Sequence, residues 1–271
     1  MEKRAIVWRV FAFLGLLLLG WLPLAIPIYH FVPDANTASI LGTLLLYGEF
    51  LYLVRWWGRR FYGETRVFQR YGLETNGGSP LPSRQILREF TRGWIGGLLG
   101  LAVLFGLETV LGWIRWRSPE MAISRLLLEA VFVGSAVGFA EEVLFRGWLW
   151  DELRRDYRVS IATVANAVIF AILHFLKPPS EILRTLPQFI GLVLLGLLLV
   201  KVKLHTQGRL GFPIGLHGGL VGGYYLINVG QWIAYTEAVP SWVTGIDKNP
   251  LAGVLGLLVL SGMLLIYRKP S

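Results

Sequence analysis

The chain has 271 residues, of which 54% are hydrophobic and only 16% are charged, and its mean hydropathy is +0.56. So few charged groups cannot cover a water-soluble surface, and we expect most of the surface to face lipid. The net charge of +9 does not indicate nucleic acid as a partner, because the basic residues are concentrated in alternate connections between apolar segments. The absence of cysteine excludes disulfides and cysteine-based catalysis.

Apolar runs long enough to cross a bilayer, roughly 20 residues each, recur about eight times along the chain. We therefore predict an all-α fold, a polytopic membrane helix bundle with about eight transmembrane helices. The first run is too long for the apolar core of a signal peptide, so we expect it to remain as an uncleaved span. The predicted spans are residues 5–29, 37–57, 93–114, 122–145, 159–176, 186–202, 212–230 and 250–267.

The positions of the basic residues predict the orientation of these spans. If the amino terminus is cytoplasmic, most Lys and Arg residues fall on the inner side, as the positive-inside rule requires. The basic residues left in outer connections are Arg115, Arg117, Arg125, Lys177, Arg184 and Lys248. Both termini are therefore predicted to be cytoplasmic. The polar segment 58–92 is expected to be an amphipathic stretch that lies along the cytoplasmic face and contacts anionic lipid.

Ionisable residues inside predicted spans are the main functional signal, because a charge at a helix centre costs about 2.5–3.5 kcal/mol or more. Glu142 and Arg146 are four residues apart, so they share a helix face and can form an ion pair. Glu141 points about 100° away from Glu142 and is the candidate general base. An alternative is that both carboxylates only balance nearby arginines such as Arg154 and Arg155 at a helix end.

His174 is the predicted partner of Glu141. Each lies about 16.5 residues from the centre of a polar turn at 157–158, so an antiparallel hairpin brings both to one height, where they can share a water. His217 lies in a glycine-rich span whose small residues predict close helix packing. Span counting puts His174 and His217 near opposite faces of the membrane. A shared site therefore requires that the hairpin tip projects into the cytoplasm, or that residues 208–215 dip inward.

In these residues the sequence resembles the CPBP family of intramembrane proteases, which includes the CAAX prenyl endopeptidases and bacterial relatives linked to bacteriocin processing and self-immunity. The family pattern is Glu-Glu-x-x-x-Arg, then Phe-x-x-x-His, then His-x-x-x-Asn/Asp, on an eight-helix membrane fold. The matching residues are Glu141, Glu142 and Arg146, then Phe170 and His174, then His217. The third motif is incomplete, because Val221 stands where the family often has Asn or Asp.

The resemblance implies an endopeptidase that acts on a membrane-associated peptide or protein. Glu141 and His174 would activate a water for attack on a peptide carbonyl, and Arg146 would hold Glu142 and the helix in place. His217 would help to stabilise the oxyanion. Residues 122–230 would form the protease core, preceded by amino-terminal transmembrane helices (1–121) and followed by a loop and the last transmembrane helix (231–271).

The sequence is compatible with a site that binds zinc and with one that does not, and with more than one function. A zinc site would be assembled from Glu141 or Glu142 with His174 and His217, as the metalloprotease label of the family suggests. The same residues can run a metal-free glutamate mechanism, which we favour slightly. Val221 supports a catalytically silent scaffold or immunity-type relative. The intramembrane carboxylates and histidines would also suit the proton relay of a proton-coupled transporter.

Overall fold

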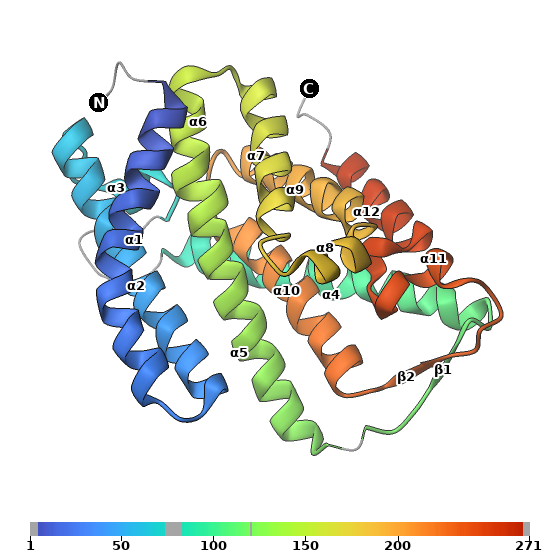
Figure 1. Cartoon of the computed structure of the whole chain (residues 1–271). Helices are drawn as coiled ribbons and strands as arrows, with labels where there is room; N and C mark the ends of the chain where they lie inside the picture. The colour runs from blue at the N-terminus through green and yellow to red at the C-terminus, as the bar shows by residue number, and fades with distance from the viewer. Residues whose placement is uncertain (1–4, 74–82, 120, 268–271) are drawn as a thin grey trace.

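The computed structural model describes residues 5–73, 83–119 and 121–267 as a bundle of helices with one short β-ribbon (Figure 1). In the ribbon, β1 (Ile114–Trp116) pairs antiparallel with β2 (Ile233–Tyr235). The predicted all-α architecture is confirmed. The helices, in chain order, are α1 (Ile6–Phe31), α2 (Ala35–Tyr62), α3 (Val67–Arg70), α4 (Arg84–Val110), α5 (Ile123–Glu142), a π-helix (Val143–Leu149), α6 (Trp150–Asp156), α7 (Val159–Leu173), α8 (Pro179–Thr185), α9 (Gln188–His205), α10 (Gly211–Val229), α11 (Ser241–Thr244), two 3₁₀ turns (Ile246–Lys248 and Pro250–Ala252) and α12 (Val254–Ile266).

Within the described ranges, five helices are long and apolar enough to cross a membrane, which makes the chain a multi-pass membrane protein. The predicted count of eight spans is not shown. The helices at the predicted fifth and eighth spans, α7 and α12, have only 15 and 13 residues, and the glycines of α10 lower its hydropathy. The fourth span is longer than predicted, because helical structure continues from Ile123 to Asp156. The polar segment 58–92 contributes its two ends to α2 and α4, while residues 74–82 lie outside the described part of the chain.

Local sequence signals set several helix ends. The side chain of Asp34 accepts a hydrogen bond from the backbone N–H of Thr37 (2.6 Å) and caps the start of α2. Ser83 caps α4 in the same way, through the N–H of Ile86 (3.2 Å). Gly63 ends α2 with φ of 65°, a left-handed conformation that glycine adopts without steric cost.

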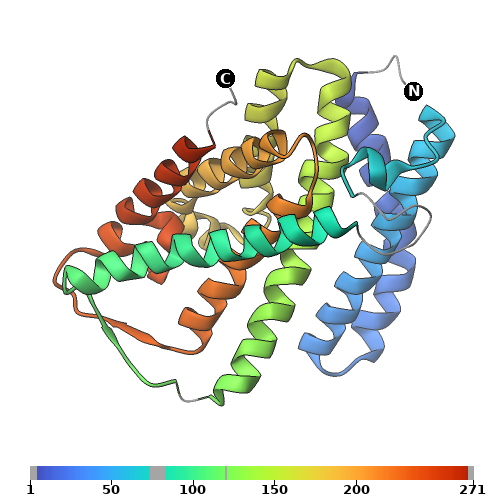
Figure 2. The same cartoon turned by 180° about the vertical axis from the view of Figure 1, so that it is seen from behind.

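Helix α10 lies in the middle of the bundle, packed against α4 on one side and α5 on the other (Figures 1 and 2). The predicted close packing of its glycines is confirmed. A Cβ atom on Gly215 would lie 2.0 Å from the carbonyl oxygen of Phe90, and one on Gly219 would lie 2.3 Å from that of Trp94. Because backbone lies against backbone at these positions, no side chain can be accommodated without moving a helix.

Replacing Gly219 with Ala is therefore expected to lower the free energy of unfolding by about 1–3 kcal/mol, the usual cost of overpacking. Gly106 of α4 is the matched control, because a Cβ there would meet no atom within 4 Å. Gly106→Ala is expected to be neutral or to stabilise by up to about 1 kcal/mol, since alanine favours a helix more than glycine does. Denaturant unfolding in detergent measures both. Equal stability of the two variants would contradict the close-packing argument.

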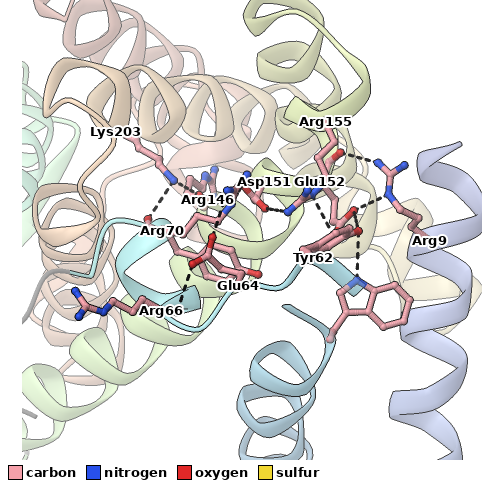
Figure 3. Close-up of polar contacts among 12 residues, drawn as sticks. Arg9, Tyr62, Glu64, Arg66, Arg70, Arg146, Asp151, Glu152, Arg155 and Lys203 are labelled. Atoms are coloured by element: carbon pink, nitrogen blue, oxygen red, sulfur yellow. Dashed lines mark hydrogen bonds and ion pairs between the residues drawn. The ribbon is translucent and has the colours of Figure 1, made fainter. Parts of the chain in front are cut away.

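A buried polar cluster fastens the amino-terminal helices to α6 (Figure 3). Arg9 is fully buried in α1, and its Nε lies 2.8 Å from an oxygen of Glu152. Tyr62, at the end of α2, donates its hydroxyl hydrogen to Glu152 (2.9 Å), and Arg70 of α3 pairs with Asp151 (2.8 Å). Arg9 is one of the basic residues that the predicted orientation places on the inner side, and the structure buries it in an ion pair. The α1–α2 hairpin is thus held at its polar end by charges of α6.

Candidate active site

Glu142 forms a buried ion pair with Arg146, as the spacing predicted. Arg146 Nη1 lies 3.0 Å from Glu142 Oε1, and both side chains have no exposed surface. The same carboxylate oxygen lies 2.9 Å from Nδ1 of His217 on α10. The second guanidinium nitrogen of Arg146 donates to the carbonyl of Gly196 on α9 (3.2 Å). This pair therefore joins α5, α9 and α10.

Glu141 lies between the two histidines. Its Oε2 atom is 3.8 Å from Nε2 of His174 and 3.8 Å from Nε2 of His217. The structure thus brings all three predicted residues together, with a separation that is slightly too long for direct hydrogen bonds. Glu141 and His174 are about one-third exposed, at 28% and 33%, whereas Glu142 is completely buried. Glu141 and His174 are thus partly accessible, although the Oε2 atom of Glu141 is itself buried, and the Glu142–Arg146 pair behind them is completely buried.

The partners of the two Nδ1 atoms orient both imidazole rings toward Glu141. His174 Nδ1 lies 2.7 Å from the carbonyl oxygen of Phe170, which can only accept a hydrogen bond. A neutral His174 therefore carries its hydrogen on Nδ1 and presents a lone pair at Nε2. His217 Nδ1 faces a carboxylate oxygen of Glu142 and is a donor for the same reason. Both Nε2 atoms remain available for chemistry beside Glu141.

The ring of Phe170 packs beside His174, His217 and Arg146. Its ring centroid is 4.5 Å from that of His174 and 6.1 Å from that of His217. The guanidinium carbon of Arg146 lies 4.4 Å from the same ring, within the range of a cation–π contact. The Phe-x-x-x-His spacing therefore places one aromatic ring against three functional side chains and also supplies the carbonyl that holds His174.

Arg146 lies on a π-helix, which the sequence did not predict. Residues 143–149 continue α5 with the wider i to i+5 pattern, which is often found at functional sites. Asn166 of α7, fully buried, donates to the carbonyl of Phe145 (2.7 Å). Lys203 of α9 donates to the carbonyl of Arg146 and to that of Tyr71 (3.2 Å for the latter). These bonds satisfy backbone carbonyls at the widened turns and connect them to two further helices.

Asn166 and Lys203 adjoin the candidate site, and the sequence did not predict this position for either of them. Lys203 is one of the basic residues that the predicted orientation places on the cytoplasmic side, and the structure buries it beside Arg146 (Figure 3). Tyr71, whose backbone carbonyl accepts a hydrogen bond from Lys203, is buried as well. Burial raises the pKa of the Tyr71 hydroxyl well above its ordinary value, so this side chain stays neutral. A signal for Asn166 existed, because an amide in the apolar run 159–176 needs a hydrogen-bond partner. No comparable pattern marked Lys203.

The chain between α9 and α10 accounts for the meeting of His174 and His217. After α9 ends at His205, residues 206–210 descend into the bundle, where α10 begins (Figure 2). Leu210 donates its N–H to the carbonyl of Gly72 (3.0 Å), and Gly208 takes a left-handed φ of 90°. The dip of residues 208–215 into the membrane stays a prediction, but this connection does return the chain into the bundle before α10 begins. It sets His217 in the second turn of α10, at the height of Glu142.

Val221 lines an apolar cavity that begins at His217. The cavity has a volume of about 160 Å³ and lies between α4, α9, α10 and α12. On α10, the cavity is lined by His217, Val221 and Tyr224, which lie on three successive turns. Gly100 and Leu104 of α4 line the cavity as well. Valine at 221 makes this wall apolar where Asn or Asp would make it polar. The departure from the family pattern therefore coincides with a hydrophobic space next to the histidine.

The zinc interpretation is not supported by the arrangement of side chains. Among the described residues, no group of three or more His, Cys, Asp or Glu side chains is placed to hold a metal ion. The expected set of Glu141, His174 and His217 comes close together, but it does not form such a group.

The candidate site of this membrane protein therefore consists of a buried glutamate–arginine pair beside two histidines that face a second glutamate. Residues 122–222 match the family described as type II CAAX prenyl endopeptidase Rce1-like, and the chain carries a domain of this family. The domain contains every predicted site residue from Glu141 to His217. The predicted resemblance to the CPBP proteases is thereby confirmed, and membership of a protease family implies a peptide substrate. The comparisons with curated proteins and with solved structures found no match.

Proposed function

We propose that the protein is an intramembrane endopeptidase of the CAAX-protease type, which cleaves a membrane-associated peptide or protein with a water activated by Glu141 and His174. The observation that carries this proposal is the position of Glu141 Oε2, 3.8 Å from the Nε2 atoms of both histidines. A water can donate to the carboxylate and to the lone pair of His174 at once, because both acceptors lie within reach of one molecule.

In the proposed reaction, Glu141 removes a proton from this water while the water oxygen attacks the peptide carbonyl carbon. The carbonyl double bond opens to an oxyanion, and the intermediate then collapses as the C–N bond breaks. Glu141 returns the proton to the leaving amine, so that acid and free amine are the only products. General acid–base assistance of this kind contributes about 10²–10⁴-fold in rate.

His217 is proposed to act in its imidazolium form as the donor to the oxyanion. Glu141, Glu142 and Arg146 together carry one net negative charge, which one imidazolium neutralises. His217 suits this role better than His174, because its Nδ1 contacts a carboxylate whereas that of His174 contacts a neutral carbonyl. A protonated Nε2 of His217 then faces the reacting carbonyl. One oxyanion donor is worth about 10²–10³-fold in rate, so the loss of a polar side chain at Val221 does not leave the oxyanion without a donor.

The apolar cavity beside His217 supports a preference in the substrate. Its volume of about 160 Å³ is close to that of a cavity that holds benzene, roughly 150 Å³. We therefore assign it to one large apolar side chain next to the scissile bond. Burying such a side chain gains about 1.5–3 kcal/mol, or roughly 10- to 100-fold in kcat/KM.

Gly100→Leu is expected to fill this cavity and to remove the preference for a large apolar residue. The new side chain would meet the flexible end of Met263, with Sδ 3.0 Å from the added Cβ, so it can be accommodated without moving a helix. Substrates with Leu or Phe at this position should lose roughly 10-fold or more in kcat/KM, while those with Ala should not. Gly106→Leu, on the same helix but outside this cavity, is the control. An unchanged ranking of substrates in Gly100→Leu would remove the cavity from the specificity of the site.

A comparison of the wild type with Glu141→Gln in native membranes tests the function itself. Membrane-associated peptides released only by the wild type, each with a new terminus, are the expected result. A scaffold or immunity-type protein would keep its biological effect in the Glu141→Gln variant and release no peptide. A proton-coupled transporter would lose flux in the same variant, again with no peptide product. Either of these outcomes would replace the protease proposal.

A further inference from the structure

A second hollow lies outside the candidate active site, between α2 and α3. Its volume is about 830 Å³, and we call it the α2 hollow. The α2 residues around it recur at turn spacing on one face of the helix, from Leu51 to Arg60, and Phe68 closes it from α3. Helix α3 can lie this close because Gly58 has no side chain, and a Cβ there would be 2.4 Å from a methyl group of Val67. The hollow is therefore a consequence of direct contact between the two helices.

The upper half of the α2 hollow carries positive charge for which the described part of the chain supplies no counter-ion. Arg55, Arg59 and Arg60 line it and are exposed. Neither Arg55 nor Arg59 forms an ion pair with any residue of the described chain, although Arg70 and Arg9 close by are both paired with carboxylates. Two arginines one helical turn apart repel each other by a few tenths of a kcal/mol unless an anion lies between them. The arrangement points to an anion from outside the protein.

The lower half of the α2 hollow is apolar and faces the direction of the membrane interior along α2. Leu51 and Tyr52 line it one turn before Arg55, and Trp56 lies at the level of the arginines. Tyrosine and tryptophan are typical of the interface between headgroups and acyl chains. A cationic half above an apolar half matches a molecule that has a phosphate at one end and a hydrocarbon chain at the other.

We propose that the α2 hollow binds one anionic phospholipid, with its phosphate between Arg55 and Arg59 and its acyl chain along Leu51 and Tyr52. Guanidinium groups bind phosphate oxygens through paired hydrogen bonds, which gives a specific site rather than a diffuse attraction. Because α2 and α3 are fastened to α6 through Tyr62 and Arg70, the bound lipid would sit on the same unit that holds the polar cluster.

Helix α4 provides a matched control for charge alone. Arg84, Arg88 and Arg92 line a hollow there, together with Gln85 and Glu89, and no aliphatic or aromatic residue takes part. This hollow has comparable positive charge, a carboxylate in its wall and no apolar half. It should not select a phospholipid.

Native mass spectrometry of the full chain, titrated in detergent with phosphatidylglycerol or phosphatidylcholine, tests the proposal. The wild type is expected to bind one phosphatidylglycerol more tightly than phosphatidylcholine. Arg55→Gln/Arg59→Gln should bind it roughly 30-fold more weakly, the loss expected for two basic residues near an anionic lipid. Arg88→Gln/Arg92→Gln should bind it as the wild type does. Equal losses in the two double variants, or no loss in the first, would overturn the site.

Glycerol 1-phosphate separates a lipid site from a site for free phosphate, because it has the phosphate and no acyl chain. A large excess of it is expected to leave phosphatidylglycerol bound. Displacement of the lipid at the same concentration in the wild type would show that the α2 hollow takes a free phosphate compound, and would overturn the assignment to a lipid. Thermal unfolding of each variant shows that the lost binding is not lost folding.

Discussion

Glu141→Gln is expected to slow peptide cleavage by about 10²–10⁴-fold, the usual contribution of a general base, while the protein stays folded. The amide cannot take a proton from water, although its shape is nearly that of the carboxylate. The Oε2 atom of Glu141 accepts no hydrogen bond from the residues that the structure describes, so the substitution removes no structural bond. Single-turnover cleavage by purified protein, with the unfolding midpoint measured in parallel, gives both quantities.

Glu129→Gln is the matched control for this experiment. Glu129 lies on the same helix, α5, but its carboxylate is held by Arg125 (2.7 Å) and by the hydroxyl of Tyr225 (2.9 Å). It contacts neither histidine of the site, so cleavage should continue at the wild-type rate. Cleavage by Glu141→Gln within about threefold of the wild type would be far too small a loss for a general base, and the activating role would pass to another group.

Part of the candidate site could be predicted from the geometry of helices and turns, whereas Phe170 and the role of His217 came from the family resemblance. The pair of Glu142 and Arg146 follows from helical spacing, which changes little when an α-helix widens to a π-helix. The meeting of Glu141 and His174 follows from equal distances to one turn, and the turn lies at 157–158 as expected, between α6 and α7. The cost of burying charge then made these residues functional candidates before any fold was known.

The parts that could not be predicted depend on contacts between distant helices. The π-helix at 143–149 is stabilised by Asn166 and Lys203, which are 21 and 57 residues away from the carbonyls they bind. Lys203 resembles an ordinary interfacial lysine in sequence, and only the position of α9 makes it a buried donor. The count of eight spans is not shown for a similar reason, because apolar composition alone does not reveal that α7 ends at Leu173, just before His174.

In the proposed mechanism, Arg146 links the stability of the protein to its activity. Its guanidinium neutralises Glu142, contacts the ring of Phe170 and bonds to the carbonyl of Gly196. The backbone carbonyl of Arg146 in turn accepts from Lys203. Arg146 thus contacts the carboxylate of Glu142, which orients His217, and the ring of Phe170, which packs near both histidines. Its backbone also belongs to the π-helix. Replacing Arg146 should therefore lower the stability of the fold, so a loss of cleavage in such a variant would not by itself identify a catalytic role.

Arg146→Met is expected to lower the free energy of unfolding by about 3–5 kcal/mol, because it leaves the carboxylate of Glu142 buried without its counter-ion. Methionine fills much of the same space, so the lost charge rather than a cavity accounts for the effect. Denaturant unfolding in mixed micelles measures the loss. An unfolding free energy equal to that of the wild type would show that His217 alone compensates Glu142.

The double variant Glu142→Gln/Arg146→Met separates charge from shape. A neutral Gln still accepts a hydrogen bond from Nδ1 of His217, and no uncompensated charge remains in the interior. Relative to Arg146→Met, the double variant should regain roughly 1–3 kcal/mol, the range of coupling between residues in contact. Cleavage should not return with it, because the proposed imidazolium of His217 needs the carboxylate beside it. A double variant less stable than Arg146→Met would contradict the ion-pair account. A double variant that regains both stability and cleavage would place the charge of His217 outside the mechanism.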